Sequence, residues 1–354
     1  MKIVTVVGAR PQFIKSVPVS RELLQNNINE VVVHTGQHFD HNMSDIFFQQ
    51  LNIPEPSYSL NINNLPHGQM TGQMLIKIEE VLLKENPDLV MVYGDTNSTI
   101  AGALAAAKLN VKVAHIEAGL RSFNMQMPEE INRIITDRIS TYLFCPTDTA
   151  VINLKNEGFT NFDCKIIQSG DVMYDSVLLF SEIERKPSIA IEDEFILCTI
   201  HRQENTDNTS RLNSISEALL IISENNKIIL PLHPRTKKKF EKLEIFKHLR
   251  NKVIFTNPVG YLEMIYLLKR CRLVMTDSGG LQKEAYFFDR PCLTLRDETE
   301  WVELVDNGYN LICGSDTESI IKNFDSIFSL EHDFGVSLYG DGRAAKKIVE
   351  EILK

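Results

Sequence analysis

Three carboxylates in the first half of the chain stand where proton-transfer groups are often found. Asp95 and Glu117 each follow an apolar, strand-like run, and Glu129 comes directly after Pro128. Asp95 or Thr96 would also suit a helix N-cap, and on that motif alone the cap is the better interpretation. Glutamates after a proline suit the first turn of a helix. Glu117 has no evident capping role. Three such carboxylates together favour a proton-transfer set.

Positive charge is concentrated at the start of the first predicted helix. The segment GARPQFIK (residues 8–15) follows the first strand-like run and places Arg10 and Lys15 near the helix N-terminus. The dipole of a helix already favours an anion at that end. The alternative is two solvated surface cations. We favour an anion-binding role, because the first turn is an unusual place to gather positive charge.

Two motifs of the second half also follow strand-like runs. HRQEN (residues 201–205) brings His201 and Arg202 to the end of a strand, where they are placed to meet an anionic ligand. PLHPR (residues 231–235) repeats this pattern one strand later. A lone histidine is more often structural, so the position and the neighbouring arginine carry the functional interpretation.

A glycine turn lies between a strand and a helix in MTDSGGLQKEA (residues 275–285). Ser278, Gly279 and Gly280 would present backbone N–H groups at the helix start, which is a typical phosphate site. Glu284, about one turn further on, could accept hydrogen bonds from the two hydroxyls of a ribose. An ordinary serine cap with a glycine turn is the structural alternative.

Composition narrows the class of protein. The chain has 354 residues, of which 43% are hydrophobic and 24% charged, with a formal net charge of −10. That charge argues against a general nucleic-acid binder. The N-terminus reads as a strand, no apolar run approaches the ~20 residues that span a bilayer, and the six cysteines are scattered. We therefore expect a cytoplasmic protein with no membrane or nucleic-acid partner.

Metal and redox cofactors are not expected. His and Cys never reach a ligand spacing such as H-x-x-x-H or C-x-x-C, so no metal site is predicted. The G-x-G-x-x-G fingerprint of dinucleotide binding is also absent.

Alternating strands and helices must position these motifs. The strand-like runs, most of them continuously apolar, lie at 2–7, 30–34, 88–93, 112–116, 141–145, 195–200, 227–232, 252–256, 273–276, 291–295 and 310–313, and helical patterns in the first half lie at 12–24, 68–84, 98–109 and 130–140. This order predicts an α/β fold with about ten or eleven strands, in two Rossmann-like, doubly wound parallel-sheet domains facing a central cleft. The boundary is expected within 168–190, so that the domains span 1–170 and 171–340.

The motifs, in this order, resemble those of the non-hydrolysing UDP-N-acetylglucosamine 2-epimerase family. The matching segments cover the chain from end to end: GARPQFIK (8–15), GDTNST (94–99), HIEAGLRS (115–122), PEEINR (128–133), HRQEN (201–205), TDSGGLQKEA (276–285), RDETE (296–300) and YGDG (339–342). The resemblance implies a GT-B-like arrangement and a homodimer. It also implies a C-terminal helix, residues 341–354, that packs back on the first domain.

The resemblance also implies a UDP-sugar substrate, no cofactor, and a role for each matching residue. Ser278, Gly279 and Gly280 would hold phosphate and Glu284 the ribose. Arg10 and His201 would meet the diphosphate. Asp95, Glu117 and Glu129 would flank the sugar, and Lys15 would support Arg10 and the acidic cluster. The same motifs imply three further substrate-binding residues: Arg133, Arg202 and Asn205.

The implied reaction interconverts UDP-GlcNAc and UDP-ManNAc by elimination followed by re-addition. The C1–O bond to UDP breaks, a base takes the C2 proton, and a 2-acetamidoglucal and UDP remain. Either the intermediate turns or the proton returns to the other face, and UDP then adds back. Cations and backbone donors would stabilise the departing diphosphate, and carboxylates would stabilise charge at C1 and move the proton. Which carboxylate is the base stays open.

Three segments depart from the family pattern. Gln12 stands where the family usually has a carboxylate, and Thr299-Glu300-Trp301 lacks a usual arginine. The segment 36–41 differs from members that bind a second, activating substrate molecule, so we do not expect allosteric activation. These departures resemble the branch that acts on UDP-2,3-diacetamido-2,3-dideoxy-glucuronate.

Three other functions stay open. A retaining glycosyltransferase would share the UDP site but would not need three carboxylates around C2. A hydrolysing 2-epimerase would release UDP and free N-acetylmannosamine. A catalytically silent UDP-sugar-binding protein is the non-enzyme alternative, and the retention of Asp95, Glu117, Glu129 and His201 argues against it.

Overall fold

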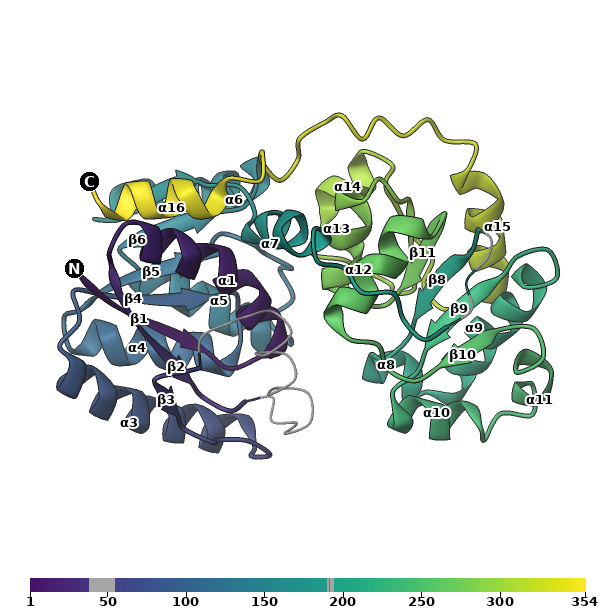
Figure 1. The fold of residues 1–354 in the computed structure, drawn as a ribbon, viewed down its shortest axis with the longest axis horizontal. Coiled ribbons are helices and arrows are strands. Elements are labelled where there is room, and N and C mark those ends of the chain that lie inside the picture. Colours follow the sequence, from purple (N-terminus) through teal and green to yellow (C-terminus); the bar gives the residue numbers. More distant parts are fainter. Residues whose placement is uncertain (38–54, 190, 192–193) are drawn as a thin grey trace. The chain divides into compact units, whose positions relative to one another are not determined.

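Thirteen strands form two parallel sheets in the computed structural model, which describes residues 1–37, 55–189, 191 and 194–354. The chain divides into two units (Figure 1). Unit 1 contains Met1–Leu179 and Ser337–Lys354, and unit 2 contains Phe180–Val336.

The sheet of unit 1 has seven strands in the order β3-β2-β1-β4-β5-β6-β7. Its strands are β1 (Lys2–Val7), β2 (Asn29–His34), β3 (Tyr58–Ser59), β4 (Leu89–Tyr93), β5 (Lys112–Ile116), β6 (Tyr142–Cys145) and β7 (Lys165–Gln168). β4 is buried along its whole length and β1 beyond its first residue, as expected for a parallel sheet with helices on both faces.

In the part of unit 1 that the structure describes, most helices connect these strands, whereas α7 and α16 follow the last strand of the sheet. They are α1 (Arg10–Gln25), α3 (His67–Glu85), α4 (Asn97–Lys108), α5 (Pro128–Ile139), α6 (Asp148–Asn156), the short 3-10 helix η1 (Phe159–Asn161), α7 (Val172–Ser181) and α16 (Ala344–Ile352). α4 is alanine-rich and packs between its neighbours α3 and α5. Pro11 stands in the first turn of α1, as expected for a residue that lacks an N–H.

The sheet of unit 2 has six strands in the order β10-β9-β8-β11-β12-β13. They are β8 (Ile196–Thr199), β9 (Ile228–Pro231), β10 (Ile254–Thr256), β11 (Leu273–Thr276), β12 (Cys292–Thr294) and β13 (Asn310–Ile312). The helices are α8 (Gln203–Thr206), α9 (Thr209–Ile222), α10 (Pro234–Phe240), α11 (Phe246–Leu249), α12 (Tyr261–Arg270), α13 (Gly279–Phe287), α14 (Val302–Asp306) and α15 (Thr317–Ile327).

Both sheets reverse their strand order at one point. Counted from the first strand of each unit, both have the Rossmann order 3-2-1-4-5-6, and unit 1 adds a seventh strand. The reversal falls between β1 and β4 in unit 1 and between β8 and β11 in unit 2. Ligands of open α/β sheets bind beside such a point, at the carboxyl ends of the strands. The motifs at Arg10, Asp95, His201 and Ser278 follow these four strands.

The predicted fold class is confirmed, but the predicted number of strands is wrong. The sequence analysis missed β3 and β7. β3 has only two residues, and β7 (KIIQ) is partly exposed along its length, so neither gives a continuous apolar run. The prediction that allosteric activation is absent is based on residues 36–41. Of these, residues 38–41 lie outside the described residues.

The C-terminal helix α16 packs against α1 in unit 1. The carboxylate of Asp175 in α7 accepts hydrogen bonds from the backbone N–H groups of Ala344 and Ala345, at 3.1 and 2.9 Å. Gly170 and Tyr339 also lie in contact, because a Cβ on Gly170 would come within 3.0 Å of the Tyr339 carbonyl oxygen. The end of the chain is therefore part of the same unit as its beginning.

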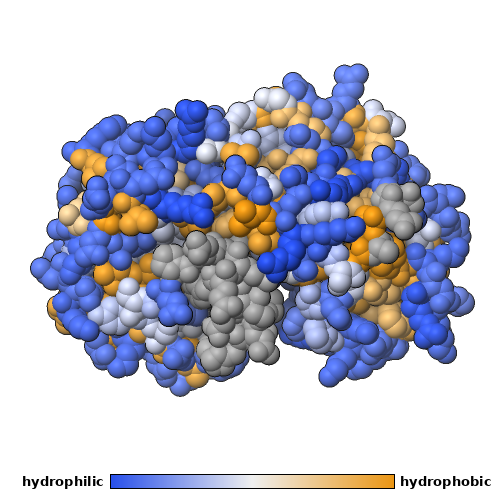
Figure 2. All heavy atoms as spheres, in the orientation of Figure 1, coloured by the Kyte–Doolittle hydropathy of each residue, from blue (hydrophilic) through white to orange (hydrophobic). Residues whose placement is uncertain are grey.

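The visible surface is mainly hydrophilic, with small separate hydrophobic areas (Figure 2). All six cysteines are free. Among the described residues, no helix combines the length and the apolar character needed to cross a membrane.

Candidate active site

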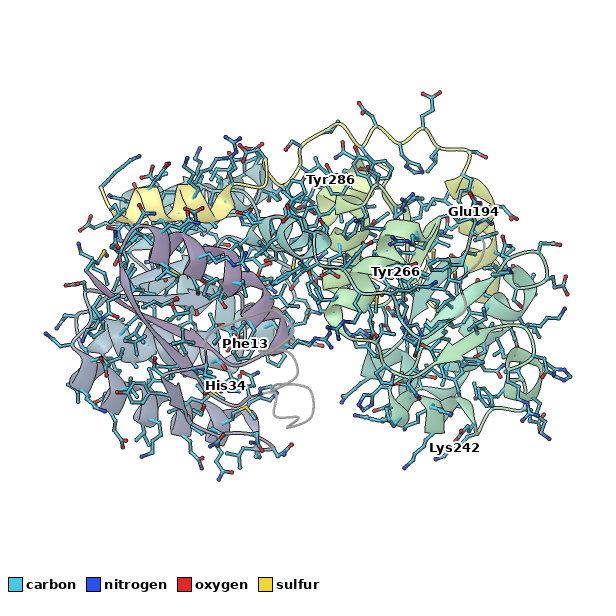
Figure 3. The ribbon with its side chains drawn as sticks, viewed as in Figure 1. Phe13, His34, Glu194, Lys242, Tyr266 and Tyr286 are labelled. Carbon is cyan, nitrogen blue, oxygen red and sulfur yellow. The ribbon has the colours of Figure 1, made fainter. Side chains whose placement is uncertain are left out.

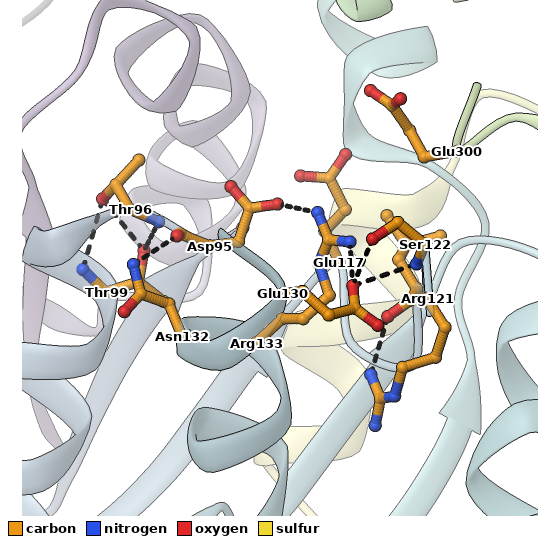
Figure 4. Close-up of polar contacts among 12 residues, drawn as sticks. Asp95, Thr96, Thr99, Glu117, Arg121, Ser122, Glu130, Asn132, Arg133 and Glu300 are labelled. Carbon is orange, nitrogen blue, oxygen red and sulfur yellow. Dashed lines mark hydrogen bonds and ion pairs between the residues drawn. The ribbon is translucent and has the colours of Figure 1, made fainter. Parts of the chain in front are cut away.

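Asp95 pairs with an arginine and does not cap the following helix. Thr96 is the N-cap of α4, and its hydroxyl accepts from the backbone N–H of Thr99. The Asp95 carboxylate instead accepts a hydrogen bond from Nη2 of Arg133 in α5 (Figure 4). Asn132, the residue before that arginine, donates from Nδ2 to the Asp95 carbonyl oxygen at 2.9 Å. Thus α5 holds both the backbone and the side chain of Asp95.

The surroundings of Asp95 change its affinity for a proton. Burial raises its pKa, and the charge and hydrogen bond of Arg133 lower it; Glu117 raises it further and Lys15 lowers it. The net direction is upward from the usual value. A raised pKa brings a carboxyl group closer to the range where it can exchange protons near neutral pH.

Glu117 follows β5 in a strained conformation. Its φ is 73°, in the left-handed region, which costs a residue with a Cβ about 1–2 kcal/mol. Its side chain is 6% exposed, and it forms an ion pair with Nζ of Lys15 in α1. A Cβ on Gly94 would lie 3.2 Å from Oε2 of Glu117, so the loop after β4 closely approaches this carboxylate. Strain of this kind is typical of functional positions.

The two adjacent glutamates of α5 differ in burial. Glu129 is exposed in the first turn of the helix. Glu130 is fully buried and accepts from the backbone N–H groups of Ser122 and Phe123, from Oγ of Ser122 and from Nη1 of Arg133 at 2.6 Å. Burial raises the pKa of Glu130, but these bonds together lower it. Glu130 therefore remains charged and ties the loop after Glu117 to Arg133.

Gln12 connects the loops that follow β1 and β4. Its Oε1 accepts from the backbone N–H groups of Gly8 and Ala9, at 2.8 and 3.0 Å. Its Nε2 donates to the Tyr93 carbonyl oxygen at 2.7 Å and lies 3.0 Å from the hydroxyl of Thr96. An amide fits both sets of partners, whereas a carboxylate would repel the carbonyl oxygen. Arg10 is the first residue of α1, directly beside this junction.

His34 is the last residue of β2, the strand that pairs with β1 on the side opposite to β4. The rings of His34 and Phe13 meet edge to face, with 4.8 Å between their centroids (Figure 3). Burial lowers the pKa of His34 to about 4, so the imidazole is uncharged at neutral pH. It therefore adds no positive charge to the end of this sheet.

In unit 2, Asp277 organises the HRQEN loop. This carboxylate is fully buried and accepts from the backbone N–H groups of His201 and Arg202 at 3.0 Å. Nδ1 of His201 lies 3.2 Å from its Oδ1, while the ring is half exposed. Asn205 donates to Asp277 and to the Leu295 carbonyl oxygen, at 3.2 and 2.9 Å. The Asn205 side chain is thus engaged within the loop.

The turn before α13 combines a cap with a tight glycine. The hydroxyl of Ser278 is the N-cap of the helix and accepts from the Leu281 N–H, as in the structural alternative for this motif. Gly279 is buried, and a Cβ there would meet Oε1 of Glu300 at 2.2 Å, while Gly280 is exposed with open space around it. Glu284 is buried in the same helix. The first N–H groups of a helix have no partner within it.

The loop at 296–300 lies against this turn. Arg296 donates from Nη1 to Glu300 at 2.8 Å. Burial raises the pKa of Glu300, but the charge and hydrogen bond of Arg296, a backbone hydrogen bond and the charge of Arg202 outweigh it and lower the pKa. Among the residues that the structure describes, no group of three or more His, Cys, Asp or Glu is arranged to hold a metal ion.

The sequence analysis named the residues at the strand ends, together with Lys15 and Arg133 that pair with them, but it gave no role to Gln12, Glu130 and Asp277, which hold the loops. Glu130 and Asp277 were quoted only within motifs, and Gln12 only as a departure. Burial was the missing signal, since adjacent Glu129 and Glu130 are identical in type and differ only in the helix face that they occupy.

A family model described as UDP-N-acetylglucosamine 2-epimerase matches residues 21–353. The chain belongs to the UDP-N-acetylglucosamine 2-epimerase family. The UDP-2,3-diacetamido-2,3-dideoxy-D-glucuronate 2-epimerase of Pseudomonas aeruginosa is 56% identical, and the alignment covers 100% of both chains. The UDP-N-acetylglucosamine 2-epimerase of Methanocaldococcus jannaschii is 45% identical over 99% of this chain and 98% of the relative. The resemblance drawn from the motifs is confirmed.

Solved structures of this epimerase family agree with the fold. The Methanocaldococcus jannaschii UDP-GlcNAc 2-epimerase in complex with UDP-GlcNAc and UDP has a TM-score of 0.90 at 44% identity, covering 100% of this chain and 99% of that one. The Neisseria meningitidis enzyme bound to UDP-GlcNAc has a TM-score of 0.88 at 32% identity, with full coverage of both. A glycosyltransferase from Rickettsia africae, 15% identical with a TM-score of 0.60, shares the fold alone.

Proposed function

We propose that this epimerase inverts C2 of a UDP-activated 2-acetamido sugar without hydrolysing it. This proposal rests mainly on the group of charged side chains at the carboxyl ends of β1, β4 and β5. There, Lys15 pairs with Glu117, and Arg133 pairs with Asp95. Carboxylates held by cations on adjacent strand ends can stabilise positive charge and exchange a proton.

The first step is departure of UDP from C1. Unit 2 supplies the groups that suit a diphosphate: the half-exposed His201, Arg202, and the N-terminal turn of α13 at Gly279 and Gly280. In unit 1, Arg10 stands at the start of α1, where a helix N-terminus also favours an anion. Donors fixed before the reaction stabilise the developing charge on the leaving group without reorganising.

The second step is transfer of the C2 proton. As the C1–O bond breaks, positive charge develops at C1, and a carboxylate takes the proton from C2, leaving a 2-acetamidoglucal. Return of the proton to the opposite face and addition of UDP to C1 gives the epimer. Asp95, Glu117 and Glu129 are the candidate acids and bases, and the raised pKa of Asp95 makes it the preferred proton carrier.

We favour UDP-2,3-diacetamido-2,3-dideoxy-glucuronate as the sugar. The Pseudomonas aeruginosa relative named for that substrate is 56% identical, against 45% for the Methanocaldococcus jannaschii relative named for UDP-GlcNAc. UDP-GlcNAc is the second candidate, since the similar Methanocaldococcus jannaschii structure is a complex with it. A cytoplasmic homodimer stays our prediction; the six free cysteines are typical of a reducing compartment.

Proton NMR in D₂O tests the reaction with each UDP-sugar separately, without added metal. We expect the C2 epimer to appear with deuterium at C2 and with little free UDP. The Asp95→Asn variant should abolish both exchange and epimerisation, while Asp163→Asn, an exposed carboxylate of the same unit, should leave them unchanged.

Each other outcome identifies a different function. Free UDP together with free sugar would show the hydrolysing reaction. Exchange with UDP-GlcNAc alone would overturn the uronate assignment. Binding of both sugars with no exchange in either would show a silent UDP-sugar-binding protein.

A further inference from the structure

A buried aspartate behind the candidate acid–base residues receives hydrogen bonds from three parts of the site. Asp137 in α5 is fully buried. Its Oδ1 lies 2.6 Å from Nδ1 of His115, in β5, and its Oδ2 accepts from Nη1 of Arg121 at 2.7 Å and from the Gly119 N–H at 3.2 Å. Every one of these partners lies within six residues of Glu117 along the chain.

His115 extends this network to the loop that carries Asp95. Its Nε2 lies 2.7 Å from the carbonyl oxygen of Gly94, the residue before Asp95. A carbonyl oxygen can only accept a hydrogen bond, and so can an ionised carboxylate. The fully buried His115 ring therefore links two acceptors, Asp137 and the Gly94 carbonyl oxygen, through its two nitrogens.

The charge of Asp137 is stabilised by its neighbours. Burial alone would raise the pKa of Asp137, but the charges and hydrogen bonds of His115 and Arg121 outweigh it and lower the pKa. Arg121 also donates from Nε and Nη2 to the two oxygens of Glu157, at 2.7 and 2.8 Å. Arg121 thus lies between two carboxylates, and each of these three charges has an opposite neighbour.

The network holds a turn that contains two residues in the left-handed region. Glu117 has a φ of 73°, and Gly119, two residues later, has a φ of 80° with its missing Cβ 2.4 Å from the Ala150 carbonyl oxygen. A non-glycine residue stays in the left-handed region only where its surroundings hold it there. Asp137 accepts hydrogen bonds from the Gly119 N–H and the Arg121 side chain, and these bonds hold the turn in this conformation.

We propose that Asp137 is a positioning residue of the epimerase site, which acts through His115 and Arg121 to hold Gly94 and Glu117 in register. The kinetic consequences of this role depend on the proposed function. Asp137 contacts neither the substrate groups nor Asp95 itself, so it is not a catalytic residue. Replacing Asp137 with asparagine removes its charge and one of the two oxygens that accept from these partners.

Kinetics of two variants separate positioning from general stability. In Asp137→Asn we expect kcat to fall about 100-fold, the size of effect that a small misplacement of reacting groups produces, while the Kd for UDP stays within twofold. Glu157→Gln is the matched control, because it breaks the outer Arg121 pair and leaves Asp137 and His115 in contact; its kcat should stay within threefold. Equal losses of kcat in both folded variants would overturn the proposal.

The bridge through His115 is tested in the unaltered protein. In two-dimensional ¹H–¹⁵N NMR of the ring, assigned with His115→Gln, the hydrogen-bonded ring proton should exchange slowly with solvent. A ring proton that exchanges as fast as that of an exposed histidine would overturn the proposal even if Asp137→Asn fails to fold. If the unaltered protein epimerises neither sugar while the His115 ring proton is protected, the proposed function fails and the network stands.

Discussion

Arg133 donates to Asp95 through one terminal nitrogen of its guanidinium group and to Glu130 through the other. Asp95 belongs to the loop after β4, and Glu130 holds the loop after Glu117 by accepting from Ser122 and Phe123. One planar side chain therefore fixes the distance between the two loops that carry the candidate carboxylates. Lysine has a single charged nitrogen and cannot make this pair of directed bonds in the same way.

Removing the charge of Arg133 is expected to change the pH dependence of the reaction. Arg133 lowers the pKa of Asp95, so Arg133→Met should raise it and move the limb of the kcat/KM profile that reports Asp95 to higher pH by about one unit or more. Arg133→Lys keeps the charge and should shift that limb less, although kcat falls. An unchanged limb in Arg133→Met would show that Asp95 does not titrate in the profile. Arg138→Met, an exposed position on the same helix, is the control.

Neutralising Lys15 is expected to impair catalysis more than stability. Its ammonium pairs with the strained, buried Glu117, so Lys15→Met leaves that carboxylate without this counter-charge. We expect kcat/KM to fall about 10²–10⁴-fold, the range for loss of a positioned acid–base group. Lys77→Met, which removes an exposed cation that pairs with Glu80, should remain within twofold of the unaltered enzyme. Comparable losses in the two variants would rule out a specific role for Lys15.

Asp277 is expected to control nucleotide binding through the loop that it holds. Asp277→Asn can still accept through one oxygen but loses the charge and places an N–H₂ group against the backbone N–H groups of His201 and Arg202. The Kd for UDP, measured by calorimetry, should rise at least 10-fold, since an unsatisfied buried polar group costs about 1–3 kcal/mol. Asp325→Asn, exposed on α15, should not change it. Unchanged affinity in Asp277→Asn would separate this loop from UDP binding.

The fold and the strand-end motifs could be predicted, because both follow from local sequence. Continuous apolar runs mark buried parallel strands, and such runs gave all six strands of unit 2. β7 could not be found in this way, since its residues are half exposed and hydrogen bonding to β6 is what makes KIIQ a strand. Likewise, the local sequence does not show whether Asp95 or Thr96 caps α4. Because Thr96 is the cap, the Asp95 carboxylate is left to pair with Arg133, 38 residues later.

Asp175 is expected to make the stability of unit 1 depend on pH. Burial raises its pKa from 3.8 to about 6, against the hydrogen bonds from Ala344 and Ala345 that lower it. Because the folded state binds the proton more tightly, the stabilisation is fully present below pH 3.8 and is lost as the pH rises through about 6. The full effect is of the order of 3 kcal/mol.

Urea unfolding at several pH values measures this effect as a difference between proteins. Asp175→Asn cannot titrate, so the stability of the unaltered protein relative to this variant should fall between pH 4 and pH 6. Asp163→Asn removes an exposed carboxylate of the same unit, and its difference from the unaltered protein should stay nearly constant over that range. If the difference in stability between the unaltered protein and Asp175→Asn does not change with pH, the Asp175 carboxylate beside α16 is well solvated.

Two adjacent glycines of α13 are expected to respond in opposite ways to alanine. In Gly279→Ala the new Cβ would stand 2.2 Å from Oε1 of Glu300. Glu300 is held by Arg296 at 2.8 Å and is largely buried, so it can move away only by breaking that bond. We expect a loss of about 1–3 kcal/mol in the free energy of unfolding, as for other overpacked sites.

Gly280→Ala is the matched control for this clash. Nothing lies within 4 Å of a Cβ at this position, and alanine favours a helix over glycine. Its free energy of unfolding should therefore be equal to or slightly above that of the unaltered protein. Both variants change backbone entropy alike, so the difference between them isolates the contact with Glu300. If the two variants unfold at the same urea concentration, then the loop at 296–300 does not pack against the start of α13 in solution, and Gly279 is not required there for steric reasons.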